Sequence, residues 1–333
     1  MTILLSNIRG RTKNNCIWLM RQAGRYLPEF RRIRADNLDF IKLCLNENLS
    51  SEITVQPLRR FKLDAAIIFS DILLVPYALG QNVSFKKDYG PILGDLNYKQ
   101  IFKIEENKFI EKLNPVYRAI KKTKEKKELR KKDLIGFVGA PWTIIIYMLN
   151  QKSPKNEDIK PILKDKKFID ELLKTIIKFL KLHIENQIKN GATIIQIFDS
   201  WAGLLDIKDY DKYIYEPTKE LVHFTKSKNT PVICFPKGIN DYKEYVNRVK
   251  PDVISIDYSA DPKEISENID ITVQGGLNPN FLLGSKEELE INVKKYLDIF
   301  KNKQYIFNLG HGVLPNTNPN MVDYLVRLVK NYS

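Results

Sequence analysis

The sequence predicts a (β/α)8 barrel, and three observations support this fold class. Eight short apolar runs, several rich in β-branched residues, recur along the 333 residues and have the character of buried strands. Amphipathic stretches long enough for helices separate most of them, including residues 170–189, 209–226 and 286–300. An unusual polar sequence follows each run. In a (β/α)8 barrel the carboxyl ends of all strands share one face, where active sites form, so the predicted fold and the predicted site agree.

The eight predicted strands fit one domain that spans residues 1–333. This length corresponds to the usual ~250 residues of such a barrel plus insertions. A doubly wound open sheet is the alternative architecture. Neither a Gly/Pro-rich linker nor an internal repeat indicates a second domain. The predicted strands cover residues 16–20, 65–69, 134–138, 193–198, 232–235, 253–256, 271–273 and 305–307.

The composition is typical of a soluble protein with a large core, since 43% of the residues are hydrophobic. No stretch approaches the ~18 consecutive apolar residues of a membrane helix. Residues 1–10 contain too short an apolar run for a secretory signal. Cys16, Cys44 and Cys234 are widely spaced and odd in number, which predicts neither a disulfide framework nor a zinc site. We expect a cytoplasmic protein without a membrane partner.

The formal net charge of +14 raises the question of nucleic-acid binding. The lysines are scattered along the whole chain, however, and no recognised nucleic-acid-binding module appears. The densest charged run, residues 121–133, has Lys and Glu at helical spacing, which is typical of a solvated helix face. We therefore expect no nucleic-acid partner.

Several cofactor motifs are missing from the sequence. It contains no G-x-G-x-x-G, no Walker A loop and no H-E-x-x-H. The histidines are His183, His223 and His311, far apart in the chain. The sequence thus predicts neither a nucleotide cofactor nor a multi-histidine metal site.

The most informative segment follows the first predicted strand, where Arg21, Gln22, Gly24 and Arg25 come directly after an apolar run. The planar guanidinium fork of arginine suits carboxylate and phosphate groups. Gly24 lies between the two cations and would permit close approach of the backbone to a ligand. This pattern predicts a pocket for a small anion with several acid groups.

Conspicuous motifs occupy residues 20–28 (MRQAGRYLP), 68–73 (IFSDIL), 136–143 (GFVGAPWT) with Tyr147 and Met148, 198–200 (FDS), 235–238 (FPKG), 274–277 (QGGL) and 308–312 (NLGHG). These motifs resemble those of the uroporphyrinogen decarboxylase family. They keep the family's order and extend over nearly the whole chain. One departure is Asp257-Tyr258, where the family commonly has Asp-Trp, and we expect it to exchange one packing aromatic for another.

The resemblance implies a cofactor-free barrel, usually a homodimer, that acts on the tetrapyrrole uroporphyrinogen III. The acetate arms would lose their carboxyl groups as carbon dioxide, which gives coproporphyrinogen III. A pyrrole protonated on a ring carbon can accept the electrons released, so the substrate supplies its own electron sink. The protein must supply placement and electrostatic stabilisation.

Asp71 is the candidate for the centre of this chemistry. Its carboxylate would accept hydrogen bonds from pyrrole N–H groups and stabilise the cation formed on protonation. From the residues alone, a cap for the following helix is the simpler interpretation, and the resemblance favours the catalytic one. Arg21, Arg25 and Arg34 would pair with substrate carboxylates. The proton donor stays open between Arg21, a water held by Arg21 and a substrate carboxylic acid, because guanidinium is a poor acid.

The resemblance also assigns contacts to residues on other segments. Gln22 and the backbone of Ala23 and Gly24 would donate hydrogen bonds. Tyr147 and Ser200 would contact substrate carboxylates or the ring. The alternatives are a core aromatic for Tyr147 and a turn residue for Ser200.

His311 would bind a propionate or acetate and not a metal. It lies between Gly310 and Gly312, which we interpret as room for close approach of a ligand. Phe30 packs either against the macrocycle or in the core.

Three functions from other classes compete with this interpretation. A Schiff-base aldolase would place a reactive lysine at a strand end, and Lys237 occupies such a position. A corrinoid-linked methyltransferase on a related barrel would hold zinc through His and Cys, yet no His-x-Cys occurs and Cys234 is far in sequence from His311. A basic nucleic-acid-binding protein is the third.

Overall fold

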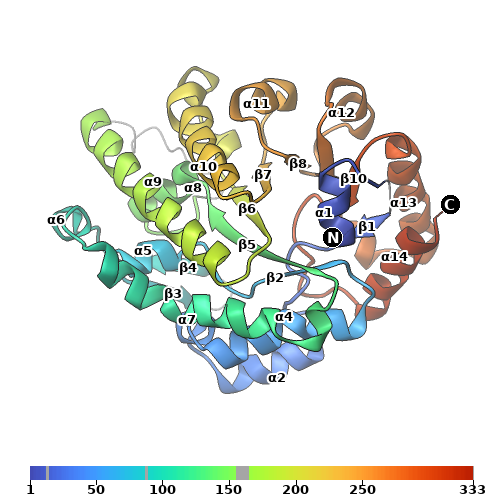
Figure 1. Ribbon diagram of the computed structural model, residues 1–333, viewed down its shortest axis with the longest axis horizontal. Coiled ribbons are helices and arrows are strands. Elements are labelled where there is room, and N and C mark those ends of the chain that lie inside the picture. The colour runs from blue at the N-terminus through green and yellow to red at the C-terminus, as the bar shows by residue number, and fades with distance from the viewer. Residues whose placement is uncertain (13–14, 87–88, 155–164, 333) are drawn as a thin grey trace.

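A computed structural model describes residues 1–12, 15–86, 89–154 and 165–332. Within these ranges eight parallel strands form a barrel, in the order β1-β10-β9-β8-β7-β6-β5-β2 (Figure 1). The first two strands of the chain meet at a seam, which confirms the predicted (β/α)8 barrel and not an open sheet. The strands are β1 (Cys16–Ile17), β2 (Ala65–Ile67), β5 (Asp133–Gly139), β6 (Ile194–Asp199), β7 (Val232–Pro236), β8 (Val253–Ile256), β9 (Thr272–Gly275) and β10 (Tyr305–Phe307).

Helices surround the barrel and follow the strands in the chain (Figure 1). Their buried faces pack on the outer side of the strands, as the amphipathic pattern predicts. The predicted helix over residues 286–300 coincides with α13. The larger helices are α2 (Pro28–Asp36), α4 (Glu47–Arg60), α7 (Glu106–Lys124), α8 (Pro141–Asn150), α9 (Lys166–Lys189), α10 (Glu216–Ser227), α11 (Tyr242–Val249), α12 (Pro262–Asn268), α13 (Lys286–Phe300) and α14 (Pro319–Asn331); the shorter ones are α1 (Ile3–Ile8), α3 (Phe40–Cys44), α5 (Leu74–Ala78) and α6 (Tyr98–Ile101).

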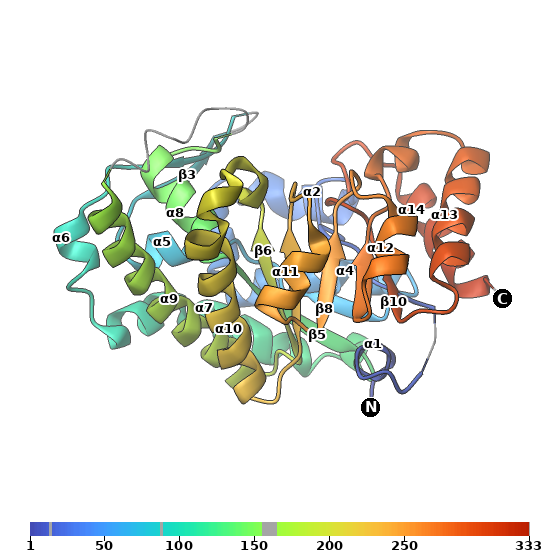
Figure 2. The same cartoon turned by 90° about the horizontal axis from the view of Figure 1, so that it is seen from above.

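The amino-terminal end of the barrel is closed by α1. Leu4 belongs to the hydrophobic cluster inside the barrel, and Asn7 Nδ2 donates to the carbonyl of Tyr305 over 3.3 Å. In Figure 2 α1 lies at the lower edge of the barrel, at the opposite end from β3. Closing this end leaves the carboxyl ends of the strands as the face on which a site can form.

The interior of the barrel is packed and contains a small polar network. The Trp18 indole donates to Gln274 Oε1 over 2.8 Å, and Gln274 Nε2 donates to Ser255 Oγ over 3.0 Å and to Gln196 Oε1 over 3.2 Å. All four residues are fully buried. A buried polar network of this kind is stabilising because its members satisfy one another.

Asp64 closes the seam between β1 and β2. Its N–H donates to the carbonyl of Ile17 over 2.9 Å, and the N–H of Ile17 donates to Asp64 Oδ2 over 2.7 Å. Lys330 of α14 pairs with the same carboxylate. Asp64 therefore joins the two short strands through its backbone N–H and its carboxylate, and the carboxylate also ties the last helix to the seam.

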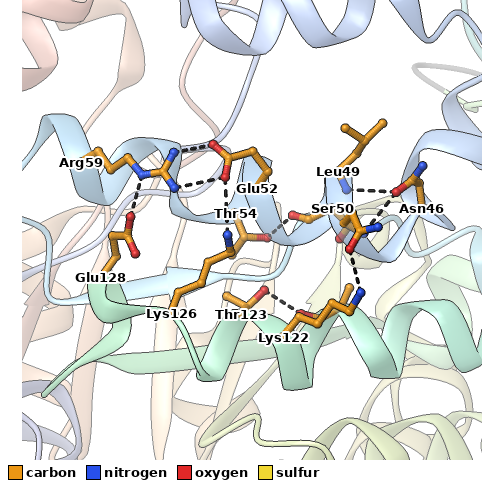
Figure 3. Close-up of polar contacts among 12 residues, drawn as sticks. Asn46, Leu49, Ser50, Glu52, Thr54, Arg59, Lys122, Thr123, Lys126 and Glu128 are labelled. Atoms are coloured by element: carbon orange, nitrogen blue, oxygen red, sulfur yellow. Dashed lines mark hydrogen bonds and ion pairs between the residues drawn. The ribbon is translucent and has the colours of Figure 1, made fainter.

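The lysine-rich run 121–133 forms an ion-pair layer between α7 and α4 (Figure 3). Lys122 pairs with Glu47 over 2.7 Å and Lys126 pairs with Glu52 over 3.5 Å. The run is not one solvated helix face, since α7 ends at Lys124 and β5 begins at Asp133. Such exposed pairs contribute about 0–1 kcal/mol each.

Other parts of the fold differ from the sequence prediction. An antiparallel pair, β3 (Val83–Lys86) and β4 (Gly90–Leu93), follows α5 and was not predicted. The predicted helix over 209–226 begins as a π-helical turn, Asp211–Tyr215. Tyr258 is 47% exposed, so the exchange of one packing aromatic for another stays a prediction. Among the residues that the structure describes, no helix combines the length and apolar character needed to cross a membrane.

Candidate active site

The loop after β1 holds Arg21 in a left-handed backbone conformation, with φ 59°. This conformation is uncommon for a residue with a side chain, and such strain is often found at functional sites. The loop is fixed by its own hydrogen bonds, from the Gln22 N–H to the Leu19 carbonyl over 3.0 Å and from the Tyr26 hydroxyl to the Gln22 carbonyl over 2.8 Å. Arg21 is therefore presented by a rigid turn.

The stem of Arg21 packs against the loop after β10. A Cβ at Gly312 would lie 2.3 Å from Arg21 Cδ, and a Cβ at Gly310 would lie 2.3 Å from the Tyr258 backbone nitrogen. Both glycines are thus approached by protein atoms. The interpretation that they leave room for a ligand beside His311 is wrong at these two positions, because Arg21 and the loop after β8 occupy the space.

Two buried hydroxyls of α4 fix the carboxyl end of β2 just before Asp71. Ser50 Oγ donates to the Phe69 carbonyl over 2.6 Å, and the Phe69 N–H donates to Thr54 Oγ1 over 2.9 Å. Thr54 Oγ1 in turn donates to the Ser50 carbonyl over 2.7 Å, a bond visible in Figure 3. These bonds continue the ladder of β2 with side chains and thereby set the direction in which Asp71 leaves the strand.

The Asp71 carboxyl combines a structural bond with a desolvated position. Its Oδ1 accepts from the Leu73 N–H over 2.8 Å, which forms an Asx turn before α5. The helix itself has Leu73 as its N-cap residue and no side-chain cap, so the capping interpretation of Asp71 is wrong. No other donor in the described ranges reaches the carboxyl. Burial raises the pKa of Asp71 to about 6. The Leu73 hydrogen bond and the charge of Arg21 both lower this pKa, but their combined effect is smaller than that of burial. The side chain is thus a carboxylate at neutral pH with capacity for further donors.

Arg21 lies within electrostatic reach of several predicted site residues. Its side chain is exposed to solvent. Surrounding protein atoms nevertheless desolvate the guanidinium and lower its pKa, so Arg21 lies in a recess that is open to solvent. The charges of Asp71 and Tyr147 raise the pKa of Arg21, and the charge of Arg25 lowers it. Three segments, after β1, β2 and β5, therefore bring these side chains together at one end of the barrel.

Tyr147 is held by the loop after β6. Its ring lies edge-on to Trp201, with 5.9 Å between centroids, and burial raises the pKa of its hydroxyl. The Trp201 N–H donates to Thr143 Oγ1 over 3.2 Å, and Thr143 donates to Asp199 Oδ1 over 2.6 Å. Asp199 is buried, and burial raises its pKa to about 7. Ser200, between these residues, is half-buried with a hydroxyl free of protein partners in the described ranges.

His311 completes the group from the β10 side. Burial, followed by the charges of Arg21 and Lys237, lowers its pKa to about 4. The imidazole is neutral at physiological pH, so one nitrogen donates and the other accepts. A neutral histidine suits a hydrogen bond to a carboxylate without adding charge.

Two of the predicted residues are engaged elsewhere. The Gln22 side chain is fully buried; its Nε2 donates to the Ala65 carbonyl over 3.0 Å and its Oε1 accepts from the Leu19 N–H over 3.0 Å, so it bridges the seam of the barrel. Arg34 donates to the Asn37 carbonyl and lies over the Phe40 ring at 5.8 Å. Their contacts to a ligand stay predictions.

The remaining predicted positions lie in or beside the same loop. Ala23 and Gly24 are half-buried on it. Phe30 is 4% exposed and packs edge-on against Phe69, which favours the core interpretation of this residue.

Metal-binding groups do not gather in the described part of the chain. No three His, Cys, Asp or Glu side chains lie close enough there to hold an ion. Cys16, Cys44 and Cys234 are free thiols in buried positions, and burial raises the pKa of each.

Comparison with known proteins decides the family. The sequence profile of uroporphyrinogen decarboxylase (URO-D) matches residues 5–332. The chain belongs to the uroporphyrinogen decarboxylase family. A uroporphyrinogen decarboxylase of Rickettsia bellii is 42% identical over 340 residues, which cover 100% of this chain and 99% of that protein. One from Rickettsia africae is 40% identical over 344 residues, covering 100% and 97%.

Comparison with a solved structure supports the barrel fold of this chain. A methyltransferase from Methanosarcina mazei superposes with a TM-score of 0.78 over 99% of this chain and 97% of its own, at 14% sequence identity. Identity this low establishes the shared barrel and carries no conclusion about the reaction.

Sequence reasoning missed residues that support the site from outside it. Local patterns do not reveal the supporting roles of Ser50 and Thr54 of α4, Thr143 and Trp201, because each acts through a contact with a segment distant in sequence. The sequence places Lys237 at a predicted strand end, and the role it suggests there is that of an aldolase lysine. Its electrostatic influence on His311 appears only in the folded chain.

Proposed function

We propose that this chain decarboxylates the acetate arms of uroporphyrinogen III and yields coproporphyrinogen III and carbon dioxide. Membership of the uroporphyrinogen decarboxylase family supports the reaction. The observation that carries the assignment of the centre is the desolvated Asp71 carboxylate beside the recessed Arg21 guanidinium. A single acid among cations suits a substrate that carries many carboxylates and develops one positive charge.

The reaction requires a temporary electron sink. A proton added to a pyrrole ring carbon makes the ring cationic. The bond between the acetate methylene and its carboxylate then breaks, carbon dioxide leaves, and the electron pair neutralises the ring as an exocyclic methylene forms. A proton joins the methylene and one leaves the ring carbon, so that each arm consumes one proton in total and becomes a methyl group.

Asp71 is suited to stabilise the cation in this sequence. An ionised carboxylate in a desolvated position interacts with a positive charge much more strongly than in water. It also offers acceptor capacity for pyrrole N–H groups, since the described chain supplies one donor to it. The Leu73 hydrogen bond and the α4 hydroxyls before Asp71 hold this carboxylate in place, so little reorganisation is needed during the reaction.

The cations and neutral polar groups serve the carboxylates of the substrate. Arg21 lies nearest to Asp71 in electrostatic terms and would hold the arm that reacts. Arg25 is exposed beside it. Neutral His311, the free hydroxyl of Ser200 and the hydroxyl of Tyr147 would bind further arms. Each charge-assisted hydrogen bond of this kind contributes about 1.5–3 kcal/mol.

Domain organisation, assembly and location are further proposals that rest on the family. We propose one domain over residues 1–333 and a homodimer in the cytoplasm, without a nucleic-acid or membrane partner. Light scattering after size exclusion tests the assembly, since a monomer mass at micromolar concentration would contradict a stable dimer.

The reaction is tested by an anaerobic assay with uroporphyrinogen III and chromatographic separation of the products. The chain should produce species with seven, six and five carboxyl groups and finally coproporphyrinogen, without an added cofactor. Failure to remove any carboxyl group under these conditions would overturn the proposed function.

A further inference from the structure

We propose that Lys237 binds a rim carboxylate of the tetrapyrrole from the wall of the barrel opposite Arg21 and Arg25. The inference rests on the proposed function and adds one cation to the site. Lys237 directly follows β7 and is half-buried. It thus lies at the carboxyl end of a strand, where the other site residues gather.

The backbone of Lys237 is held by two hydrogen bonds to the end of β6 and the loop after it. Its N–H donates to the Asp199 carbonyl over 3.0 Å, and its own carbonyl accepts from the Gly203 N–H over 3.1 Å. A Cβ at Gly203 would lie 2.3 Å from the Gly238 carbonyl oxygen, so the loops after β6 and β7 are in close contact. A lysine on such a fixed backbone is well positioned for a ligand.

The acid nearest to this loop is already fully engaged. Asp257 follows β8, and its carboxylate accepts from the Gly238 N–H over 2.6 Å, the Ser259 N–H over 2.8 Å and the Tyr242 hydroxyl over 3.3 Å. The Ser259 hydroxyl donates to it as well. Asp257 is 3% exposed, so it serves to join these loops and not to neutralise Lys237.

The second acid beside the loop does not pair with the ammonium group either. Burial raises the pKa of Asp199 to about 7, and its hydrogen-bond donor is Thr143. Among the described residues, Asp199 forms no ion pair with Lys237. In the described ranges Lys237 therefore has no acidic partner. A half-buried cation without a counter-ion favours an anionic ligand.

Lys237 and His311 lie close enough to interact electrostatically. The positive charge of Lys237 lowers the pKa of that histidine together with the charge of Arg21. Its ammonium group is therefore within electrostatic reach of the same site. The strand order separates β7 from β2 by two strands and from β1 by three, so Lys237 and Arg21 lie on opposite walls.

This arrangement matches the shape of the substrate. A tetrapyrrole is a ring with carboxylates around its whole rim. Cations on one wall alone, Arg21 and Arg25, would hold one side and leave the far side without a partner. Lys237 on the opposite wall, with neutral His311 between, would bind the far side and limit tilting of the ring.

The test compares Lys237→Met and Lys237→Arg with the wild-type chain. The control is Lys303→Met, because Lys303 is also half-buried but lies before β10 at the other end of the barrel. Binding of oxidised uroporphyrin and coproporphyrin is measured by fluorescence, and turnover of uroporphyrinogen is measured anaerobically. Thermal unfolding verifies that each variant is folded.

We expect Lys237→Met to weaken uroporphyrin binding about tenfold, as the loss of a charge-assisted hydrogen bond predicts. KM should rise more than kcat falls, Lys237→Arg should recover most of the affinity, and Lys303→Met should resemble wild type. Uroporphyrin affinity of a folded Lys237→Met within twofold of wild type would overturn the inference. If the wild-type chain neither binds uroporphyrin nor decarboxylates uroporphyrinogen, the proposed function itself fails.

Discussion

The stem of Arg21 lies so close to Gly312 that a Cβ there would fall 2.3 Å from Arg21 Cδ and 2.5 Å from Cγ. The glycine after His311 thus serves the arginine after β1, although almost three hundred residues separate them in sequence. The loop after β10 packs against the side chain of Arg21, and the left-handed turn fixes its backbone.

Gly312→Ala should therefore displace the Arg21 side chain and reduce kcat/KM at least about tenfold, since a misplaced catalytic group can lower the rate up to a hundredfold. Steady-state kinetics on folded protein measure the effect. Gly136→Ala is the control, because its methyl would meet Gln187 Oε1 at 2.6 Å inside β5, away from Arg21. Equal loss of kcat/KM per folded molecule in both variants would contradict the role of Gly312.

Thr54→Val should disturb Asp71 through the end of β2. The variant keeps the shape of the side chain but leaves the buried Phe69 N–H without an acceptor, which costs about 1–3 kcal/mol of unfolding free energy. We expect kcat to fall as well, because Asp71 lies two residues further along. Thr123→Val is a matched control: Thr123 is equally buried and donates only to its own helix, at the Ala119 carbonyl.

Gln22→Met should act first on stability, because it removes both hydrogen bonds that bridge the seam between β1 and β2. The Ala65 carbonyl and the Leu19 N–H would stay buried without partners, at a cost of about 1–3 kcal/mol each. Chemical denaturation measures the change. In Gln56→Met, which replaces a buried glutamine whose Oε1 has no partner, stability should be retained. A Gln22→Met chain as stable as wild type, with weaker substrate binding, would favour a ligand role for Gln22.

Asp71→Asn should stabilise the fold above about pH 6. The carboxyl has a pKa of about 6 in the folded chain and an ordinary value of 3.8, so the folded state holds its proton more tightly. Stability from this group is present below pH 3.8 and is lost as the pH rises through 6. The asparagine variant avoids this loss, which is about 1–2 kcal/mol for a partly accessible group.

The measurement is denaturant unfolding of both chains at pH 4 and pH 7.5. The advantage of the variant should be absent or small at the lower pH and present at the higher. A variant less stable than wild type at pH 7.5 would show that the ionised carboxyl makes net favourable contacts in the folded chain.

The sequence was sufficient for the barrel because each strand is a local apolar run and each site motif follows one. Residues 253–256 and 305–307 coincide with β8 and β10. The first strand was predicted too long: the Met20 N–H donates to the Asn308 side chain over 2.9 Å instead of to a neighbouring strand. That bond depends on a partner 288 residues away, which no local pattern reveals.

For the site residues, too, local motifs could be predicted and contacts between distant segments could not. Arg21, Asp71, Tyr147 and His311 were identified from motifs, and their electrostatic coupling needed the folded barrel. A glycine in a sequence indicates that some group comes close to the backbone, but it does not indicate which group. The sequence therefore could not show that Gly310 and Gly312 are approached by protein atoms. Lys237 could not be assigned from sequence, since its lack of a counter-ion depends on how Asp257 and Asp199 are bonded.

The role of Asp71 is tested most directly by the anaerobic turnover of uroporphyrinogen III by Asp71→Asn, together with the affinity of this variant for oxidised uroporphyrin. We expect kcat to fall at least about a hundredfold, as for other preorganised electrostatic groups, and the polyanion to bind as tightly as in wild type or more tightly. A folded Asp71→Asn chain that converts uroporphyrinogen to coproporphyrinogen at nearly the wild-type rate would contradict this role.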